Sequence, residues 1–488
     1  MKLLDLMENI SYRLAGNYSD GLLNKEIERV TTDPRQADGK TLFVCARFAT
    51  GDGHNNVNAA YAAGCRVFLA ERSLPSLPDG AAVLLVEKTK PLLGELAACC
   101  YGHPGRALTV FGITGSTGKS AVAHTVTALL RRAGHSVASL TTDGIDLNGA
   151  LRPCGSVVPN GADIQTILKE FLNTGVEFAV LEFSAYMLEN HAHTAIPFTA
   201  LLLTNFDPNH IGNGLYPDPG VYRAIKASLF EGGAPFLVLP ANFADFSVDV
   251  SGARALHFGE DGDLQALNVQ SICEKRGFGT RFELALANGE KARVSLPVPG
   301  DYAVQNALAA ASLALIAGLS LNEIATGLAD AKPCGRLECV GAYEDRYIYV
   351  DSAYTAEDLA QALKALSPYT KGRLSVLLGS VGGRARWRRA ALGRAAAEYA
   401  DYVYLTADDP DCEDPVSICE DMMQEMEGRD RCCVIPDRRE AIGRAVLEMR
   451  PGDVLLLAGK GGERFQLIRG KKEAFDEREI VKEALLAI

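Results

Sequence analysis

The sequence predicts an α/β protein of three domains, the central one built on a mostly parallel sheet. At 488 residues the chain is too long for one ordinary domain, for which roughly 100–200 residues are typical. Short apolar strands alternate with helical segments along most of the chain, a pattern typical of a sheet covered on both faces. A glycine-rich turn at residues 112–120 also lies directly between a strand and a helix. Motifs and turns place the domains at 1–105, 106–335 and 336–488.

The first 105 residues predict a small α/β domain. Its apolar strands cover Thr41 to Cys45, Val67 to Ala70 and Ala82 to Val86, with helical segments between them. The segment from Tyr101 to Gly105 reads Tyr-Gly-His-Pro-Gly, and such a cluster of turn-forming residues is typical of a linker. We therefore expect the first domain to end there.

The second domain opens with the apolar strand from Leu108 to Phe111 and is predicted to hold a P-loop-type parallel sheet. Further strands end near Leu140, Glu182 and Thr204, and helices alternate with them. A turn from Pro333 to Arg336 is expected to close this domain.

The third domain is predicted to be Rossmann-like, because four apolar strands are each followed by a polar residue or a glycine. In open α/β sheets, ligands bind outside the carboxyl ends of the strands. We therefore expect the residues that follow these strands to line a ligand cleft. The strands are Tyr347 to Val350, Leu374 to Leu378, Tyr402 to Leu405 and Val454 to Ala458, followed by Asp351, Gly379, Thr406 and Gly459.

Composition argues against several classes of partner. A net charge of −12 is unlike that of a general binder of nucleic acid or membrane surfaces. The chain starts without a basic segment followed by an apolar one, and no apolar run approaches the ~20 residues that cross a bilayer. The 12 cysteines show no C-x-x-C spacing and are typical of reduced thiols. We expect a cytoplasmic, monomeric enzyme that acts on small molecules and binds neither nucleic acid nor membranes.

The strongest motif is the turn Gly-Ile-Thr-Gly-Ser-Thr-Gly-Lys-Ser at residues 112–120, which indicates ATP binding. Its backbone N–H groups can surround a polyphosphate, the Lys119 ammonium can neutralise it, and the Ser120 hydroxyl can ligate Mg²⁺. The common P-loop pattern has glycine where this chain has Ile113, so a glycine-rich turn without nucleotide is the alternative. The residues expected to hold the nucleotide and its metal ion are Gly115, Ser116, Thr117, Gly118, Lys119 and Ser120.

Two further polar residues follow strands of the same sheet. Glu182 ends an apolar strand, and its carboxylate is a hard oxygen ligand suited to a metal ion. His210 lies just after the strand that ends at Thr204. Each alone would be interpreted as a solvated or core polar residue, but both belong to the sheet edge that carries Lys119. We therefore predict that both are functional residues and that Glu182 is a metal ligand beside Ser120.

Motifs follow one another in a characteristic order along nearly the whole chain. They are Thr32 to Arg35, Asp52 to His54, Gly115 to Ser120, Glu182 to Ser184, Thr204 to His210, Tyr222 to Lys226, Asn306, Gly335 to Glu338, Asp351, Gly379 to Arg389, Thr406 to Pro410 and Gly459 to Glu463. In this order they resemble the motifs of the Mur ligases, and among these the MurE branch.

The resemblance implies an ATP-dependent ligase that adds the third residue to UDP-MurNAc-L-Ala-D-Glu during peptidoglycan synthesis. In that family ATP phosphorylates a substrate carboxylate, and an amino acid's amine then attacks the acyl phosphate to give an amide. Such catalysis depends on positioning and on cations, which Lys119 and Mg²⁺ would supply. The first domain is implied to bind the uridine nucleotide of the acceptor.

The resemblance also implies roles for individual residues, among them a metal-ligand role for His210. In the family the lysine at Lys226 is carbamylated, the asparagine at Asn306 lies near the adenine, and the aspartate at Asp351 meets the ribose. Arg384 falls where an arginine holds the carboxylate of the incoming amino acid, a task suited to bidentate pairing. The other residues implied to bind nucleotide or substrates are Asp33, Arg35, Ser184, Arg336, Asp408, Asp409, Gly459 and Glu463.

Several positions depart from the family pattern, mostly where substrates bind. The aspartate before the metal-site histidine is Asn209, the arginine that meets the muramoyl peptide falls at Ala192, and Tyr186 and Tyr354 replace histidines. An arginine–carboxylate hydrogen bond contributes roughly 1.5–3 kcal/mol. We favour a MurE-like enzyme with a rebuilt pocket over a paralogue acting on another carboxylate or a catalytically impaired nucleotide-binding subunit. The candidate substitutes in a rebuilt pocket are His191, His193 and Tyr186.

The specificity loop carries a further substitution. In family members that add meso-diaminopimelate it reads Asp-Asn-Pro-Arg, and the arginine grips the distal carboxylate. Here it reads Asp408-Asp409-Pro410-Asp411. Because negative charge suits a distal ammonium, we predict L-lysine or another basic amino acid in place of meso-diaminopimelate. The alternative is that Asp411 is an ordinary turn residue facing solvent.

Overall fold

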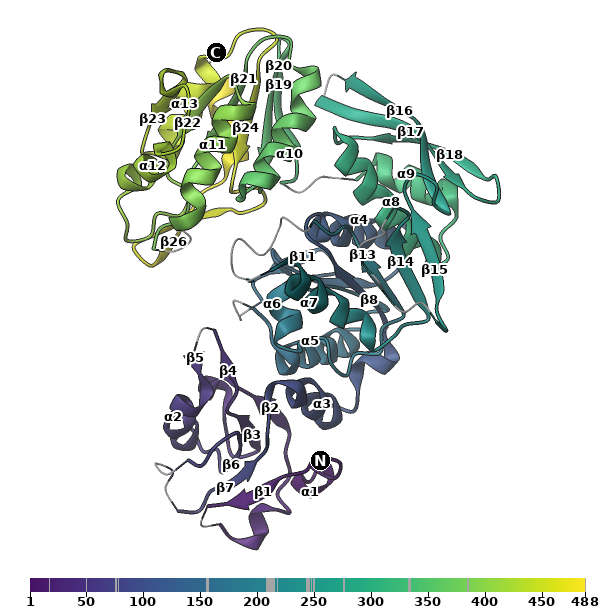
Figure 1. Ribbon diagram of the computed structural model, residues 1–488, viewed down its shortest axis with the longest axis vertical. Helices are drawn as coiled ribbons and strands as arrows, with labels where there is room; N and C mark the ends of the chain where they lie inside the picture. Colours follow the sequence, from purple (N-terminus) through teal and green to yellow (C-terminus); the bar gives the residue numbers. More distant parts are fainter. Residues whose placement is uncertain are drawn as a thin grey trace. The chain divides into compact units, whose positions relative to one another are not determined.

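The chain forms two compact units in the computed structural model, residues 1–239 with 243–256, and residues 240–242 with 257–488 (Figure 1). Each unit is an α/β assembly, which confirms the predicted fold class. The boundaries expected at residues 105 and 335 stay a prediction. The structure describes residues 1–16, 18–49, 51–74, 77, 79–154, 158–207, 216, 218–242, 246, 248, 251–274, 277–331, 335–383 and 386–487.

The first unit begins with a five-stranded sheet in the order β1-β7-β6-β3-β2. Strand β1 is antiparallel to its neighbour and the other four run parallel, so the three strands expected in this region are confirmed. The elements are α1 (Leu3–Leu6), β1 (Arg13–Ala15), β2 (Arg29–Thr31), β3 (Thr41–Val44), β4 (Arg47–Phe48), β5 (Gly51–Asp52), α2 (Val57–Ala62), β6 (Val67–Ala70), β7 (Ala82–Leu85) and α3 (Lys90–Cys100).

The small sheet is held against the rest of its unit by a close helix contact. A Cβ on Gly94 of α3 would lie 2.4 Å from Thr194 Oγ1, and one on Gly161, the first residue of α5, would lie 2.7 Å from the Gly94 nitrogen. Asn160 caps α5, and its Nδ2 donates to Thr32 Oγ1 at 3.2 Å. Glycine at both positions therefore lets α3 and α5 touch backbone to backbone.

The larger sheet of the first unit contains a parallel array in the order β9-β12-β8-β13-β14, extended by the antiparallel hairpin β10–β11. Strand β8 is central, and its Val110, Phe111 and Ile113 are completely buried. The elements are β8 (Thr109–Thr114), α4 (Lys119–Arg132), β9 (Val137–Thr141), β10 (Gly144–Leu147), β11 (Ala150–Arg152), α5 (Gly161–Asn173), β12 (Phe178–Glu182), α6 (Ala185–Glu189), β13 (Ala200–Leu203), α7 (Pro219–Glu231) and β14 (Phe236–Pro240).

The second unit starts with an antiparallel ribbon that the sequence did not predict. Phe278 at its tip is 3% exposed and stacks on Tyr369 at 4.4 Å between ring centroids, and its backbone nitrogen donates to Tyr349 Oη at 2.6 Å. This contact joins the ribbon to the C-terminal sheet of the same unit. Strand β15 (Arg254–Phe258) crosses the boundary between the two units. The elements that follow it are β16 (Leu264–Glu274), β17 (Gly277–Leu286), β18 (Lys291–Leu296), α8 (Asp301–Ile316) and α9 (Leu321–Ala329).

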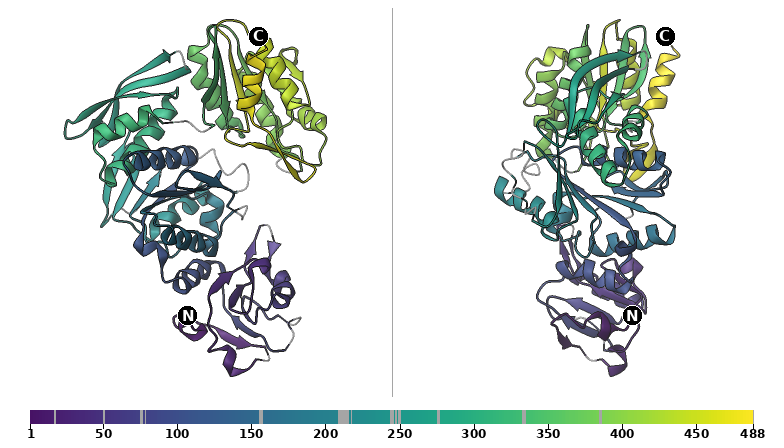
Figure 2. Two further views of the ribbon diagram at one scale, coloured as in Figure 1. Left: turned by 180° about the vertical axis from the view of Figure 1, so that it is seen from behind. Right: turned by 90° about the vertical axis from the view of Figure 1, so that its right-hand side faces the viewer.

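The C-terminal sheet has six strands in the order β19-β20-β24-β21-β22-β23, with only β19 antiparallel. Separate apolar clusters pack on its two faces beneath the helices (green to yellow in Figure 2). All four predicted strands are confirmed. The elements are β19 (Glu338–Tyr343), β20 (Arg346–Asp351), α10 (Ala356–Leu366), β21 (Leu374–Leu378), α11 (Arg389–Tyr399), β22 (Tyr402–Leu405), α12 (Pro415–Met423), β23 (Cys432–Val434), α13 (Arg438–Leu447), β24 (Val454–Ala458), β25 (Phe465–Ile468), β26 (Lys471–Ala474) and α14 (Glu477–Leu485).

Candidate functional site

The glycine-rich turn joins the end of β8 to the start of α4, as predicted. Gly118 has φ +79°, and a Cβ on Gly115 would lie 1.9 Å from Thr204 Oγ1, so neither position accepts a larger residue without rearrangement. Thr204 Oγ1 donates to the Thr117 carbonyl at 2.6 Å, and the Thr117 nitrogen donates to Asn205 Oδ1 at 3.0 Å. The end of β13 therefore fixes the shape of the turn.

Two oxygen ligands lie together beside the turn. Ser120 Oγ, in the first turn of α4, donates to Glu182 Oε2 at 2.8 Å, and Glu182 is 4% exposed at the end of β12. The Thr142 nitrogen donates to the same carboxylate oxygen at 3.2 Å. A buried hydroxyl and carboxylate in contact are the hard oxygen ligands that Mg²⁺ prefers, so these residues fit the predicted ion.

The third predicted metal ligand, His210, lies outside the described residues, as does Asn209. Within the part of the chain that the structure describes, no group of three or more histidine, cysteine, aspartate or glutamate side chains could hold a metal ion. Of the three predicted metal ligands, the structure therefore describes Ser120 and Glu182.

Lys226 is buried in α7, where it is 1% exposed and its Nζ donates to the Gly115 carbonyl at 2.6 Å. This helix begins at Pro219. The side chain of Asp218, the residue before it, caps the helix by accepting a hydrogen bond from the Val221 nitrogen. Burial, together with the nearby Lys119 charge, holds the pKa of Lys226 well below its ordinary value, although Glu182 opposes the shift. The charged form of Lys226 is therefore disfavoured at its place beside the turn.

The segment after β12 shows how the substituted positions are arranged. Ser184 caps α6, its Oγ accepting from the Met187 nitrogen at 3.2 Å. Ala192 is completely buried in the core of the unit. Burial, with His191 nearby, lowers the pKa of His193 to about 4, so its imidazole is neutral at pH 7. Tyr186 Oη accepts from the Ala49 nitrogen at 3.0 Å.

Two predicted substrate residues in the small sheet pair with each other. The Asp33 carboxylate caps a short helical turn through the Arg35 nitrogen at 2.9 Å, and Arg35 Nη2 donates back to it at 2.8 Å. The Arg35 side chain is exposed, so this ion pair contributes little to stability. Arg35 is therefore accessible to a ligand.

The predicted ribose ligand Asp351 ends β20 and is buried. Its carboxylate accepts from the Leu337 nitrogen at 2.7 Å and from the Ala353 nitrogen at 2.8 Å. Burial raises the pKa of Asp351 to about 6, even though Arg336 and these two N–H groups favour the charged form. Arg336 therefore lies close enough to influence the predicted ribose ligand, and Asn306 lies half-buried in α8.

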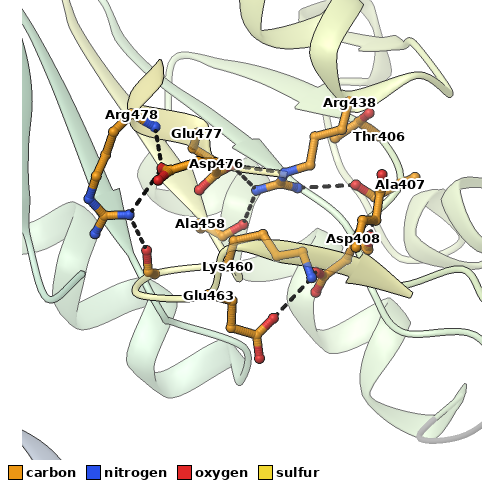
Figure 3. A network of polar contacts seen from close by, with 12 residues as sticks. Thr406, Ala407, Asp408, Arg438, Ala458, Lys460, Glu463, Asp476, Glu477 and Arg478 are labelled. Carbon is orange, nitrogen blue, oxygen red and sulfur yellow. Dashed lines mark hydrogen bonds and ion pairs between the residues drawn. The ribbon is translucent and has the colours of Figure 1, made fainter. Parts of the chain in front are cut away.

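A cluster of charged residues occupies the ends of β22 and β24 (Figure 3). Lys460 is 1% exposed and contacts Asp409, Glu463 Oε2 at 2.9 Å and Asp408 Oδ1 at 3.4 Å. Burial lowers the pKa of Lys460, but the three carboxylates outweigh it and raise the pKa overall. The predicted residues Asp408, Asp409, Gly459 and Glu463 are thus brought together around a lysine that the sequence interpretation did not include. The Gly-Lys-Gly-Gly-Glu motif at residues 459–463 contains this lysine and could have indicated it from the sequence.

Arg438, also not predicted, fixes the same two strand ends. Its guanidinium is completely buried and donates to Glu477 at 2.7 Å, to the Ala407 carbonyl at 3.2 Å and to the Ala458 carbonyl at 2.8 Å (Figure 3). A buried arginine with three acceptors of this kind holds the loops after β22 and β24 in one geometry.

Asp411 has a local structural role. It adopts φ +51°, and its Oδ1 accepts from the Gly470 nitrogen at 2.6 Å in the β25–β26 turn. The negative charge beside Lys460 therefore comes from Asp408, Asp409 and Glu463. Arg384 lies outside the described residues.

These features define a nucleotide-binding enzyme of the phosphate-loop class with a Rossmann-like C-terminal sheet. Residues 113–314 match the Mur ligase middle domain, and residues 335–461 match the Mur ligase, glutamate ligase domain. The chain belongs to the Mur ligase family of ATP-dependent amide ligases. None of the helices in the described part of the chain has both the length and the apolar character needed to cross a bilayer.

Relatives match along almost the full length. The chain is 30% identical over 489 residues, covering 99% of both chains, to UDP-N-acetylmuramoyl-L-alanyl-D-glutamate–2,6-diaminopimelate ligase of Caldanaerobacter subterraneus. It is 30% identical, covering 95% of both chains, to UDP-N-acetylmuramyl-tripeptide synthetase 2 of Oceanobacillus iheyensis.

Solved structures show the same fold. A UDP-N-acetylmuramoyl-L-alanyl-D-glutamate–2,6-diaminopimelate ligase matches with a TM-score of 0.67 and 23% identity, covering 100% of this chain and 99% of that one. The MurF ligase of Thermotoga maritima in complex with ADP matches with a TM-score of 0.60 and 19% identity, covering 94% and 96% of the two chains.

We predict that Asp351→Asn removes a pH dependence of stability. A carboxyl whose pKa is raised in the folded protein favours folding while protonated, and that contribution is lost as pH rises through the folded pKa. The pKa of Asp351 rises from 3.8 to about 6, so the free energy of unfolding of the wild type should fall by about 3 kcal/mol between about pH 4 and pH 7. The variant has no carboxyl group at this position and should not show this fall. Urea unfolding at both pH values measures this, with Asp345→Asn, at an exposed carboxylate, as the control. Identical pH profiles for wild type and Asp351→Asn would contradict the assignment.

Proposed function

We propose that this ligase adds L-lysine, or another basic amino acid, to the D-glutamate of UDP-MurNAc-L-Ala-D-Glu. The full-length match to relatives named as ligases of that acceptor supports the reaction. The observation that carries the choice of amino acid is the cluster in which one buried lysine, Lys460, faces the carboxylates of the buried Asp408 and Asp409 and the more exposed Glu463. A distal ammonium complements such a cluster, and a distal carboxylate does not.

The first half-reaction activates the acceptor. A carboxylate oxygen of the acceptor attacks the γ-phosphorus of ATP, the bond to the β–γ bridging oxygen breaks, and ADP leaves with that electron pair. The turn at 115–120 positions the triphosphate through its N–H groups and the helix N-terminus, and Lys119 places an ammonium beside the transferred charge. Mg²⁺, when bound, would neutralise phosphate oxygens from its place on Ser120 and Glu182.

The second half-reaction forms the amide. The α-amine of the incoming amino acid attacks the acyl carbon, inorganic phosphate leaves, and the ammonium proton is lost to solvent. In this proposal Arg384 pairs with the amino acid's α-carboxylate, while Gly459 and the acidic cluster meet its side chain. Ser184 and Arg35 bind the acceptor, and Asn306, Arg336 and Asp351 bind the nucleoside of ATP.

Lys226 is proposed to carry a carbamate. Its neutral amine would form an N–C bond to CO₂ and release a proton, and the low pKa that burial causes makes this amine available. The Lys119 charge that disfavours an ammonium at Lys226 would favour the resulting anion. The modification would therefore turn a buried amine into an anion next to the turn.

A paralogue that acts on a different carboxylate is the second candidate. It is favoured by the segment at residues 191–193, where Ala192 is buried and His193 is neutral at pH 7. This segment offers no fixed cation to an acceptor carboxylate. A matrix of acceptors against amino acids, scored by phosphate release and product mass, separates the two candidates.

Lys119→Ala is expected to lower amino-acid-dependent phosphate release by about 100-fold or more, because a preorganised cation beside the transferred phosphate is lost. The assay uses UDP-MurNAc-L-Ala-D-Glu, L-lysine and Mg–ATP. Lys371→Ala, at an exposed lysine paired with Asp345, is the control and should keep wild-type activity. Equal rates for Lys119→Ala and an active wild type would refute the catalytic role. A wild type inactive with every acceptor would instead support an impaired nucleotide-binding subunit.

Protein equilibrated with ¹³C-bicarbonate should show one carbamate ¹³C NMR signal that disappears in Lys226→Arg. The arginine keeps a positive charge but its guanidinium stays protonated and does not react with CO₂. Lys169→Arg, at a lysine over the Tyr101 ring, is the control and should keep the signal. A fully active wild type that lacks the signal would rule out the carbamate.

Asp411→Arg is expected to shift the preference from L-lysine toward meso-diaminopimelate by about tenfold to hundredfold in relative kcat/KM, since a charged hydrogen bond contributes about 1.5–3 kcal/mol. Asp411→Asn is the matched control, because asparagine keeps an oxygen acceptor for Gly470 and tolerates the left-handed backbone. It should leave the preference for lysine unchanged. A wild type that prefers meso-diaminopimelate would show that the specificity assignment is wrong.

A further inference from the structure

A second buried arginine, outside the Lys460 cluster, connects the two loops that border the proposed amino-acid site. Arg389 is the first residue of α11 and its side chain is 0% exposed. Nη1 donates to Glu413 Oε1 at 2.8 Å and to Asp421 Oδ2 at 2.9 Å. Nη2 donates to Glu413 Oε2 at 2.8 Å and to the Val381 carbonyl at 3.0 Å. The arginine and Glu413 thus form a bidentate pair.

Glu413 also reaches the glycine- and arginine-rich loop directly. Its Oε2 accepts from the Gly383 nitrogen at 2.7 Å, and its Oε1 accepts from Arg386 Nη2 at 3.0 Å. Hydrogen bonds from Arg389, helped by the one from Gly383, lower the pKa of Glu413 to about 2, so it is charged at every working pH. The Glu413 carboxylate therefore accepts hydrogen bonds from Gly383 and Arg386, on either side of positions 384–385, and links them to the specificity loop.

The backbones of the two loops also touch. The Gly382 nitrogen donates to the Asp409 carbonyl at 2.8 Å, and a Cβ on Gly382 would lie 1.9 Å from the Pro410 oxygen. Asp409 itself contacts Lys460. The backbone of Gly382 is therefore in direct contact with the backbone of Asp409 and Pro410.

Helix stability does not account for the place of Arg389. A cation in the first turn of a helix is opposed by the partial positive charge of the helix N-terminus. Arg389 is in the first turn of α11, and its positive charge is compensated by the carboxylates of Glu413 and Asp421. Bidentate arginine–carboxylate pairs add geometric specificity to a contact. The arrangement therefore fixes one relative position of the two loops.

We propose that Glu413 and Arg389 are positioning residues for the incoming amino acid, setting the Asp408–Asp409 carboxylates at a fixed place relative to residues 379–383 and 386–389. This inference rests on the proposed function, because it takes those carboxylates to face the amino acid's side chain. Neither residue touches the amino acid. Both act through the loops that they join, and they set its affinity and the discrimination between basic and acidic side chains.

Trp387, the chain's one tryptophan, reports on this loop without any assay of activity. It lies in a short 3-10 helix (Arg386–Arg388), between Arg386, which pairs with Glu413, and the start of α11, and is 55% exposed. Release of the loop should move its emission to longer wavelength and increase quenching by acrylamide.

The test compares Glu413→Gln, which keeps the shape of the side chain and removes its charge, with wild type. We expect the Trp387 shift, unchanged far-ultraviolet circular dichroism, and an amino-acid KM raised about tenfold or more, with the KM for ATP unchanged. The preference for L-lysine over meso-diaminopimelate should shrink. Glu483→Gln, which removes the exposed Arg439–Glu483 pair in the same unit, is the matched control and should match wild type.

Arg389→Lys is the second variant, in case Glu413→Gln does not fold. It keeps the charge but loses the bidentate fork, so we expect the same changes at smaller size. An unchanged Trp387 signal in a folded variant overturns the proposal, and so does a shifted signal with unchanged amino-acid KM and selectivity. If wild type releases no phosphate with any amino acid, the proposed function fails, while the fluorescence comparison still decides whether the pair holds the loop.

Discussion

A cation that is removed from water must be compensated, because an isolated buried charge costs several kcal/mol. Arg389, Arg438 and Lys460 satisfy this constraint with carboxylates at 2.7–2.9 Å. Lys226 satisfies it differently: its described hydrogen bond goes to a carbonyl oxygen, and burial lowers its pKa. The side chains of Arg389, Arg438 and Lys460 hold loops in place at the ends of parallel strands. Lys226 instead lies beside the phosphate turn, where its charged form is disfavoured.

The sequence predicts the parallel parts of the fold well because their signal is local. A buried parallel strand is a short, continuous apolar run, and Leu374–Leu378 or Val454–Ala458 can be recognised without knowledge of any neighbour. The ribbon of β16 to β18 was missed because no helices separate its strands, so the strand–helix alternation that marks the other sheets is absent there. Lys291–Leu296 does alternate polar and apolar residues, which is the local pattern of a half-buried strand. The place of the ribbon depends on Phe278 packing against residues far along the chain.

The same distinction separates the predicted site residues from the missed ones. The turn that carries Lys119 and Ser120 is a continuous motif whose chemistry is evident from spacing alone. By contrast, Arg389 meets Glu413 across 24 residues, and Lys460 meets Asp409 across 51. Neither pairing has a signature in the sequence. Charged residues in glycine-rich loops are normally solvated, and only the fold shows that these are buried.

In the proposed function, the choice of amino acid depends on the charge of the cluster at the specificity loop. Lys460 supplies one positive charge, against the three carboxylates of Asp408, Asp409 and Glu463. The side chain of L-lysine ends in an ammonium and would add one positive charge, whereas that of meso-diaminopimelate ends in both an ammonium and a carboxylate and would add no net charge. The cluster is therefore electrostatically incomplete in a way that a basic side chain completes.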